Sequence, residues 1–121
     1  MSHIYLVALV AAIHTVIMLL EMFRWPMVLK AVTGYGRDIA GSTLGLGVNI
    51  GLYNGFLAAG LWLSLAWGTP DQRWALQVFL LGCVAVAGVV GAATFRKPSF
   101  LVIQTFFAGL ALWRVAGAAA A

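Results

Sequence analysis

Two ionisable side chains, His14 and Glu21, interrupt a long apolar stretch at the beginning of the chain. They are seven positions apart, so a helix places both on one face, about 10 Å apart along its axis. The two groups cannot bond directly at this separation, but a small ligand, a water chain or a cation could bridge them. Each group also has a plainer interpretation: Glu21 marks the end of the apolar stretch and pairs with Arg24, and His14 is a neutral histidine bonded to a neighbouring helix.

Further polar side chains fall within the other apolar stretches. Asn49 and Tyr53 are four positions apart and share a helix face, whereas Asn54 points closer to a row of glycines. If a helix begins near residue 43, Asn49 lies about 9 Å from its end, a depth similar to that of Glu21. The sequence therefore predicts a polar cluster with these members: His14, Glu21, Asn49, Tyr53, Asn54, Thr94 and Gln104. We interpret it as the lining of a polar cavity open to the cytoplasm; the alternative is an interhelical hydrogen-bond network that only fixes helix packing.

Other chemistries find little support in the sequence. A metal site is not expected, because histidine and cysteine pairs at ligand spacing are absent. The single cysteine, Cys83, is expected to behave as a small hydrophobic residue. Asp38 and Asp71 fall in predicted loops, which argues against a Ser-His-Asp arrangement inside the apolar segments. We therefore expect neither a metal nor a cofactor.

The composition assigns the chain to a class of protein. Hydrophobic residues make up 64% of the 121 residues, and charged residues make up only 8%. Soluble domains carry about 25% charged residues, so this chain could not cover the surface of a soluble fold. The high hydrophobicity excludes a disordered chain, and the single cysteine excludes a disulfide framework. The chain is therefore expected to be an integral membrane protein whose net charge of +4 contacts lipid headgroups, with no nucleic acid as a partner.

The charged residues separate four uncharged stretches, 4–20, 39–70, 74–95 and 98–113. The first and the last are slightly shorter than the roughly 20 residues of a membrane-spanning helix, and residues 21–23 and 115–117 can extend them. Gly41 and Ser42 mark the start of one such helix, and the Gly68-Thr69-Pro70 sequence marks its end. The expected helices lie near residues 4–24, 43–67, 73–95 and 98–117. They predict an all-α membrane protein, a four-transmembrane-helix antiparallel bundle forming one domain over residues 1–121, with no β-sheet. The longest loop covers residues 25–42 and has room for a short interfacial helix.

The positions of Lys and Arg predict the orientation in the membrane. The first and third loops hold Arg24, Lys30, Arg37, Arg96 and Lys97, whereas the opposite side holds Arg73 and Arg114. Because cytoplasmic loops carry the excess of basic residues, loops one and three are expected in the cytoplasm and both termini in the periplasm. The first apolar stretch lacks a basic beginning and a small-residue cleavage site, so we expect a retained helix.

A row of small residues marks one face of the second predicted span. Gly47, Gly51, Gly55 and Ala59 recur every four positions. In lipid, helices associate by close packing rather than by a hydrophobic driving force, so such a row allows another backbone to approach. Packing within the bundle is the simpler interpretation, and a homo-oligomer interface is the alternative.

Three segments of the sequence resemble a known family. Residues 20–25 (LEMFRW), 49–61 (NIGLYNGFLAAGL) and 82–94 (GCVAVAGVVGAAT) are similar to the bacterial membrane family catalogued as domain of unknown function 1304. The resemblance implies a small four-helix protein of the bacterial inner membrane and implies no activity. The positions that match its recurring motifs are His14, Glu21, Asn49, Tyr53, Asn54 and Thr94. Many members carry Glu and Gln where this chain has Ile13 and Ile50, which speaks against a mechanism that needs a second intramembrane acid.

The polar cluster supports three hypotheses about function. The first is binding or transport of a small molecule or ion, with His14 as a proton-sensitive group and a homo-oligomer as the transporting form. The second is an intramembrane enzyme of the isomerase type, in which His14 and Glu21 move a proton on a lipophilic substrate. The third is a structural or accessory protein. The sequence does not decide whether the protein is an enzyme.

Overall fold

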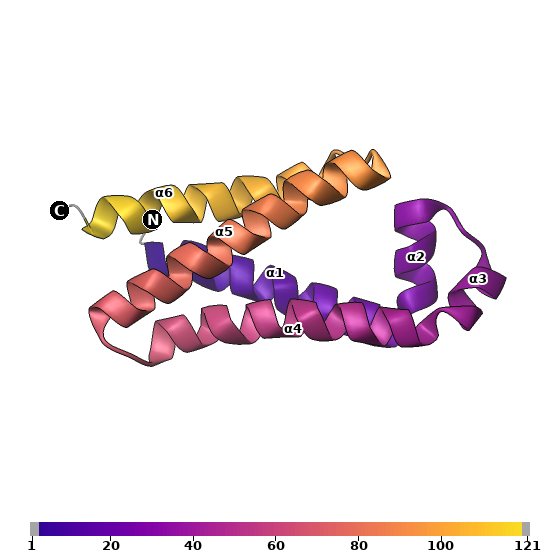
Figure 1. Ribbon diagram of the computed structural model, residues 1–121, viewed down its shortest axis with the longest axis horizontal. Coiled ribbons are helices and arrows are strands. Elements are labelled where there is room, and N and C mark those ends of the chain that lie inside the picture. The colour runs from indigo at the N-terminus through magenta and orange to yellow at the C-terminus, as the bar shows by residue number, and fades with distance from the viewer. Residues whose placement is uncertain (1–2, 120–121) are drawn as a thin grey trace.

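The computed structural model describes residues 3–119, which form a bundle of four long helices. The helices are α1 (His3–Phe23), α4 (Leu44–Ala66), α5 (Pro70–Phe95) and a last one that begins as η1 (Leu101–Phe106) and continues as α6 (Phe107–Ala119). They run alternately in opposite directions, so the beginning of α1 and the end of α6 lie at the same end of the bundle (Figure 1). All four are long and apolar enough to cross a membrane. The predicted all-α, four-helix antiparallel membrane fold is confirmed, and the described residues contain no strand.

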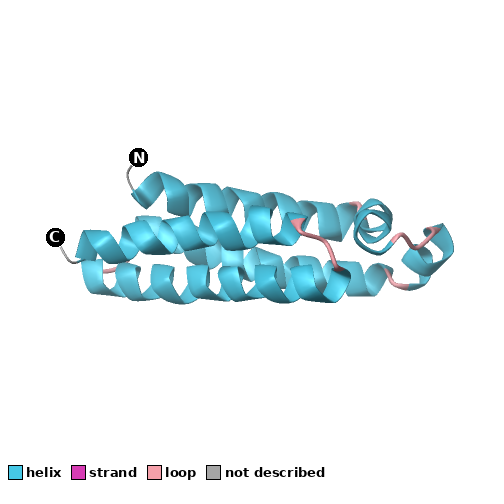
Figure 2. Ribbon diagram, turned by 90° about the horizontal axis from the view of Figure 1, so that it is seen from above, coloured by secondary structure: helices cyan, strands magenta, loops and turns pink. Residues whose placement is uncertain are grey.

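Two short helices fill the longest connection, where the sequence predicts room for one. The first, α2 (Trp25–Thr33), lies across the end of the bundle, and α3 (Arg37–Ser42) leads back to α4 (Figure 1). Pro26 occupies the first turn of α2, where its missing N–H costs nothing, and Gly34 ends the helix at a φ of 81°. Loops are confined to the two ends of the bundle (Figure 2). The end near α2 is therefore closed over by more chain than the other end.

Trp25 anchors α2 to the bundle. Its side chain is 6% exposed, and its indole Nε1 donates a hydrogen bond of 2.9 Å to Thr43 Oγ1. The ring also lies against Gly47, where an added Cβ would approach three ring carbons within 2.8 Å. The contact with Gly47 therefore sets how closely α2 approaches the beginning of α4.

Replacing Trp25 with phenylalanine is expected to lower the free energy of unfolding by about 1 kcal/mol, the net value of one hydrogen bond. Phenylalanine keeps most of the ring contact with Gly47 but cannot donate to Thr43. Thermal unfolding in detergent, followed by circular dichroism, measures the loss. Trp67→Phe is the matched control, because the Trp67 side chain is 65% exposed. Equal losses in both variants would contradict the anchoring role.

The glycine row lies in the contact between α1 and α4, the most extensive helix contact of the molecule. An added Cβ at Gly51 would lie 2.6 Å from Met22 Cγ and 3.0 Å from the backbone oxygen of Met18, and one at Gly55 would lie 2.7 Å from Met18 Sδ. These glycines therefore serve packing within the bundle. Ala59 departs from the prediction, because it is exposed. The row curves away from α1 after Gly55, since a spacing of four residues drifts around a helix of 3.6 residues per turn.

The apolar core lies in the middle of the bundle and draws on all four long helices. Its wholly buried members include Val7 and Ala11 of α1, Leu61 of α4, and Leu81 and Val84 of α5. From α6 come Ala108, Ala111 and Val115. Small residues on α6 allow it to approach α1 and α5 closely. This core separates the polar side chains at the α2 end of the bundle from those at the opposite end.

Candidate ligand-binding site

Three side chains of the predicted cluster form a continuous hydrogen-bonded chain between α1 and α4. His14 Nδ1 lies 3.0 Å from Asn54 Oδ1, and Asn54 Nδ2 donates to Glu21 Oε2 at 2.6 Å. The spacing along α1 separates His14 from Glu21, and the Asn54 amide fills that gap. The sequence alone allows a ligand, a water chain or a cation to bridge His14 and Glu21. In the structure the side chain of Asn54 makes this link. Glu21 has Asn54 as its partner instead of Arg24.

The amide of Asn54 can serve both neighbours in only one orientation when Glu21 is ionised. A carboxylate only accepts hydrogen bonds, so the NH2 group must face Glu21 and the carbonyl oxygen must face His14. The carbonyl in turn needs a donor, which places a hydrogen on His14 Nδ1. The His14 side chain is 1% exposed, and its other nitrogen, Nε2, is buried without a hydrogen-bond partner among residues 3–119. In a neutral imidazole with that hydrogen, Nε2 is an acceptor, so the chain of hydrogen bonds begins at an acceptor in the core and ends at a carboxylate near the end of α1.

Glu21 also lines a cavity of about 250 Å³ at the α2 end of the bundle. The walls come from the end of α1, from α2, from the connection that precedes η1 and from η1 itself. Most of the lining is apolar: Ile17, Leu20, Val28, Ala31, Val32, Phe100 and Ile103. The polar lining residues are Glu21, Lys97, Ser99 and Gln104. An apolar cavity with a few converging polar groups is the usual form of a small-molecule site.

A π-helical segment, η1, positions Gln104 at this cavity. Six residues, Leu101–Phe106, form wide turns in place of regular α-helix, and such segments are frequent at functional sites. Thr105 Oγ1 donates to the backbone oxygen of Ala85 at 3.0 Å, and Thr105 packs so closely on Gly88 that no Cβ would fit there. With Thr105 held against α5, its neighbour Gln104 lies in the lining of the cavity beside α1.

Three members of the predicted cluster lie elsewhere. Asn49 and Tyr53 are exposed on the outer face of α4, with 60% of the Tyr53 side chain exposed, and Thr94 is exposed near the end of α5. The Tyr53 ring makes an edge contact with Phe56, 6.1 Å between centroids, on the same face. The reason is helix rotation: five residues separate Asn49 from Asn54, which turns the two amides about 140° apart at 3.6 residues per turn. Side chains at a similar depth therefore form one cluster only when their helices also turn them toward each other.

The structure adds lining residues that the sequence interpretation did not include. Lys97 and Ser99 belong to the third connection, which the predicted topology already places at the same end of the bundle as Glu21. Val28, Ala31 and Val32 form one side of the short helix α2, and their apolar spacing is visible in the sequence. The π-helical turns of η1 have no comparable signal in the sequence.

The arrangement suits binding by hydrogen bonds and apolar contact. Glu21 Oε2 is bonded to Asn54, and no second partner of the carboxylate occurs in the described part of the chain. Its remaining acceptor capacity is therefore open to a donor in the cavity. Among residues 3–119, no three His, Cys, Asp or Glu side chains come together in a group that could hold a metal ion.

Comparison with known families assigns the chain. A family described as protein of unknown function (DUF1304) matches residues 8–116, a range that contains the His14–Asn54–Glu21 chain and the whole lining of the cavity beside it. No curated protein and no solved structure is significantly similar to the chain. Because the match covers most of its length, this multi-pass membrane chain belongs to the DUF1304 family.

Proposed function

We propose that the protein binds a small, mostly apolar molecule that carries a hydrogen-bond donor, such as an amine or a hydroxyl group. The observation that carries the proposal is the position of Glu21, which is bonded to Asn54 on one side and lines an apolar cavity on the other. The carboxylate accepts from the donor of the ligand, and the aliphatic side chains of α1 and α2 contact its apolar body. Transport of such a molecule would be the task of an assembly of two or more copies.

The size of the cavity limits the ligand. A volume of about 250 Å³ is slightly below the roughly 300–1,000 Å³ of pockets that hold drug-sized molecules. The ligand is therefore a small organic molecule rather than a large lipid. The largely aliphatic walls favour such a molecule over a bare ion, which needs several polar ligands.

The basic residues of the connections support a location for the site. By the positive-inside rule, the end of the bundle with α2 and Lys97 faces the cytoplasm of a bacterial cell, and both termini face the periplasm. The cavity would then exchange its ligand with the cytoplasm or with the inner leaflet of the bacterial inner membrane.

The two other hypotheses make different predictions. The isomerase hypothesis needs both His14 and Glu21 to reach the substrate, yet His14 is 1% exposed and is linked to the cavity only through Asn54. In a structural protein, the hydrogen-bonded chain only fixes the packing of α1 on α4, and no small molecule stabilises the fold. Binding is favoured because the chain ends in a cavity rather than in packed side chains.

The test is a thermal-shift screen with small apolar amines and alcohols on detergent-purified protein. A ligand at a hundredfold excess over its Kd is expected to stabilise the wild type by about 2.7 kcal/mol. Glu21→Gln is expected to lose this stabilisation and still fold, because glutamine retains one oxygen for the Asn54 N–H.

Asp38→Asn is the matched control, since Asp38 is an exposed carboxylate on α3 outside the cavity lining. It should respond to ligands as the wild type does. Ligands that stabilise Glu21→Gln as strongly as the wild type would refute a role for the carboxylate. A library without any stabilising member would favour the structural hypothesis.

A further inference from the structure

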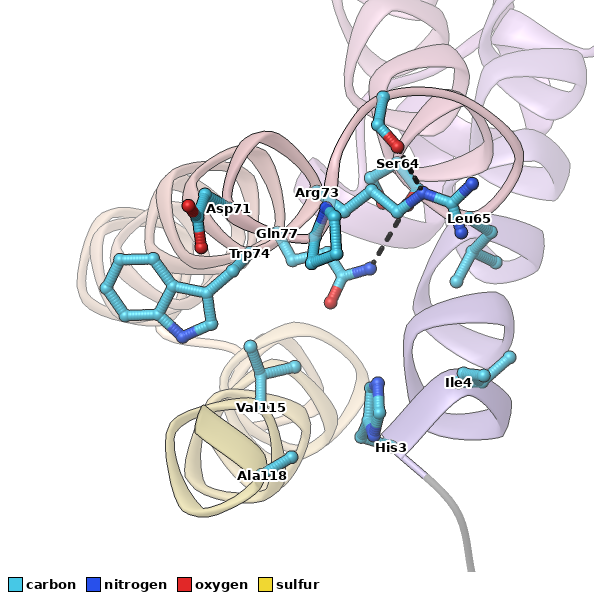
Figure 3. Close-up of a pocket in the computed structure, with 12 residues that line it drawn as sticks. His3, Ile4, Ser64, Leu65, Asp71, Arg73, Trp74, Gln77, Val115 and Ala118 are labelled. Atoms are coloured by element: carbon cyan, nitrogen blue, oxygen red, sulfur yellow. Dashed lines mark hydrogen bonds between the residues drawn. The ribbon is translucent and has the colours of Figure 1, made fainter. Parts of the chain in front are cut away.

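A second, larger cavity lies at the opposite end of the bundle, where α1 begins and α6 ends (Figure 3). It has a volume of about 750 Å³ and lies between the beginnings of α1 and α5 and the ends of α4 and α6. Ile4 lines this cavity and Ile17 lines the other one, so their nearest lining residues on α1 are about 20 Å apart at 1.5 Å per residue. The second cavity is therefore separate from the site of the proposed function.

Gln77 lies at the base of this cavity with half of its amide unused. The side chain is 5% exposed, and its Nε2 donates to the backbone oxygen of Ser64 at 3.3 Å. The amide oxygen points the other way, into the space between Val115 and His3 (Figure 3). No hydrogen bond to that oxygen occurs within the described part of the chain. The oxygen faces the cavity with its acceptor capacity unused, so a ligand that donates a hydrogen bond can occupy this position.

Arg73 supplies a positive charge on the same face of α5, one turn before Gln77. Its Nε donates to the backbone oxygen of Gly68 at 3.0 Å, which holds the side chain at the rim. The terminal guanidinium nitrogens make no hydrogen bond among the described residues and are available to an anion. Guanidinium groups match the geometry of phosphate oxygens. Residues four positions apart on a helix have Cβ atoms about 5–6 Å apart, so one small ligand can contact both residues.

The rest of the lining places the cavity at the surface of a membrane. Trp74, whose side chain is 43% exposed, lines the rim, and tryptophan favours the headgroup layer. Asp71 also lines the cavity, on the far side of Gln77 from the Arg73 guanidinium (Figure 3). A ligand in the cavity therefore faces the Arg73 cation, the neutral acceptor of Gln77 and the Asp71 carboxylate in that order.

We infer that this cavity binds a phosphoethanolamine group, with its phosphate at Arg73 and its ammonium at Gln77 Oε1 and Asp71. The ammonium supplies an N–H donor to the Gln77 amide oxygen, and its positive charge complements Asp71. The two-carbon link between phosphate and amine spans neighbouring turns of α5. Ile4, Leu65 and Val115 provide an apolar wall for acyl chains if the group belongs to a membrane lipid.

The experiment uses delipidated protein reconstituted in nanodiscs of phosphatidylcholine, alone or with added phosphatidylethanolamine or its N-methylated and N,N-dimethylated forms. Native mass spectrometry counts the retained lipid, and thermal unfolding measures stabilisation. Phosphatidylethanolamine is expected to bind at least about tenfold more tightly than phosphatidylcholine, since a charge-assisted hydrogen bond separates them. The N-methylated and N,N-dimethylated lipids each retain an N–H donor and should still bind more tightly than phosphatidylcholine, whose headgroup has no N–H. Equal binding of the ethanolamine and choline lipids to the wild type would overturn the inference without any variant.

Variants then test the roles of the Gln77 and Arg73 side chains. Gln77→Leu is expected to abolish the preference for ethanolamine over choline, and Arg73→Gln is expected to weaken the binding of both lipids. Asn49→Leu is the matched control for the amide, because Asn49 is exposed on α4 and lines neither cavity. A Gln77→Leu protein that folds and keeps the full preference would refute the role of the Gln77 amide oxygen.

A final arm separates the two sources of the ligand group. Free phosphoethanolamine is added to protein in detergent without lipid. Stabilisation by the free compound, lost in Gln77→Leu, supports the inferred chemistry and identifies a soluble phosphate ester as a sufficient ligand. Stabilisation only by the lipid supports the same chemistry and identifies the membrane as the source. Glu21→Gln should change neither result, so this inference and the proposed function can fail independently.

Discussion

Replacing Asn54 with leucine is expected to lower the free energy of unfolding by about 2–6 kcal/mol, although the two side chains have the same branched shape and the same number of non-hydrogen atoms. The substitution removes the hydrogen bonds to His14 Nδ1 and Glu21 Oε2 together. Leaving a buried polar group without its partner costs about 1–3 kcal/mol, and both partners lose theirs at once. The loss arises at the contact of α1 with α4, so it should loosen the most extensive helix contact of the molecule.

Unfolding by SDS titration, followed by circular dichroism, measures the effect of Asn54→Leu. Asn49→Leu is the matched control, because it removes the same amide from an exposed position on the same helix. The control should stay within about 0.5 kcal/mol of the wild type, as surface substitutions usually do. If the two variants lose equal stability, the amide of Asn54 does not bridge α1 and α4.

Substituting Gly51 with leucine is expected to destabilise the bundle by about 3 kcal/mol or more, at the upper end of the effects of overpacking. Even a Cβ at this position meets backbone atoms of α1, the Met18 oxygen at 3.0 Å and the Met22 nitrogen at 3.1 Å. Backbone atoms of a helix cannot move singly, so α1 and α4 must separate. The separation should also break the hydrogen bonds of Asn54, since they cross the same contact.

Gly45→Leu is the control for Gly51→Leu. An added Cβ at Gly45 meets nothing within 4 Å, and the position lies on the same helix. Leucine has a higher helix propensity than glycine, so this variant should be neutral or slightly stabilised. Thermal unfolding of both variants in the same detergent makes the comparison. A tolerated leucine at Gly51 would show that the glycine row does not set the distance between the helices.

The sequence was sufficient for the fold because its main determinants are local. Runs of apolar residues between charges define the four long helices, and short connections make successive helices antiparallel neighbours. Pro26 and Gly34 mark the ends of α2, and the bounds of such elements need no knowledge of distant contacts.

The candidate site depends on helix rotation, which the sequence indicated only in part. His14, Glu21 and Asn54 come together because the face of Gly51 and Gly55 turns toward α1, and Asn54 lies beside that face. Asn49 shares the depth of the site but not its direction. The glycine row distinguishes the two asparagines, because it identifies the face of α4 that packs against α1. Asn54 lies beside that face, whereas Asn49 points away from it. The π-helical turns of η1 depend on long-range contacts, such as the hydrogen bond from Thr105 to α5. No local pattern in the sequence predicts these turns.

The core between the two cavities has a consequence for permeation. On α1, the buried residues from Leu6 to Ala11 follow the wall of one cavity and precede the wall of the other. The same order holds on α5, where Leu81 and Val84 lie between the lining residues near Arg73 and the connection at Lys97.

This band of wholly buried aliphatic side chains acts as a dry seal across a single copy of the protein. Water and ions pass poorly through apolar constrictions, because dewetting closes them. In this conformation the core separates the two cavities, so a solute that enters one cavity must leave it by the same opening. If the two cavities bind the ligands proposed above, net flow across the membrane through a single copy would require the apolar core to open, or a second copy to provide another path.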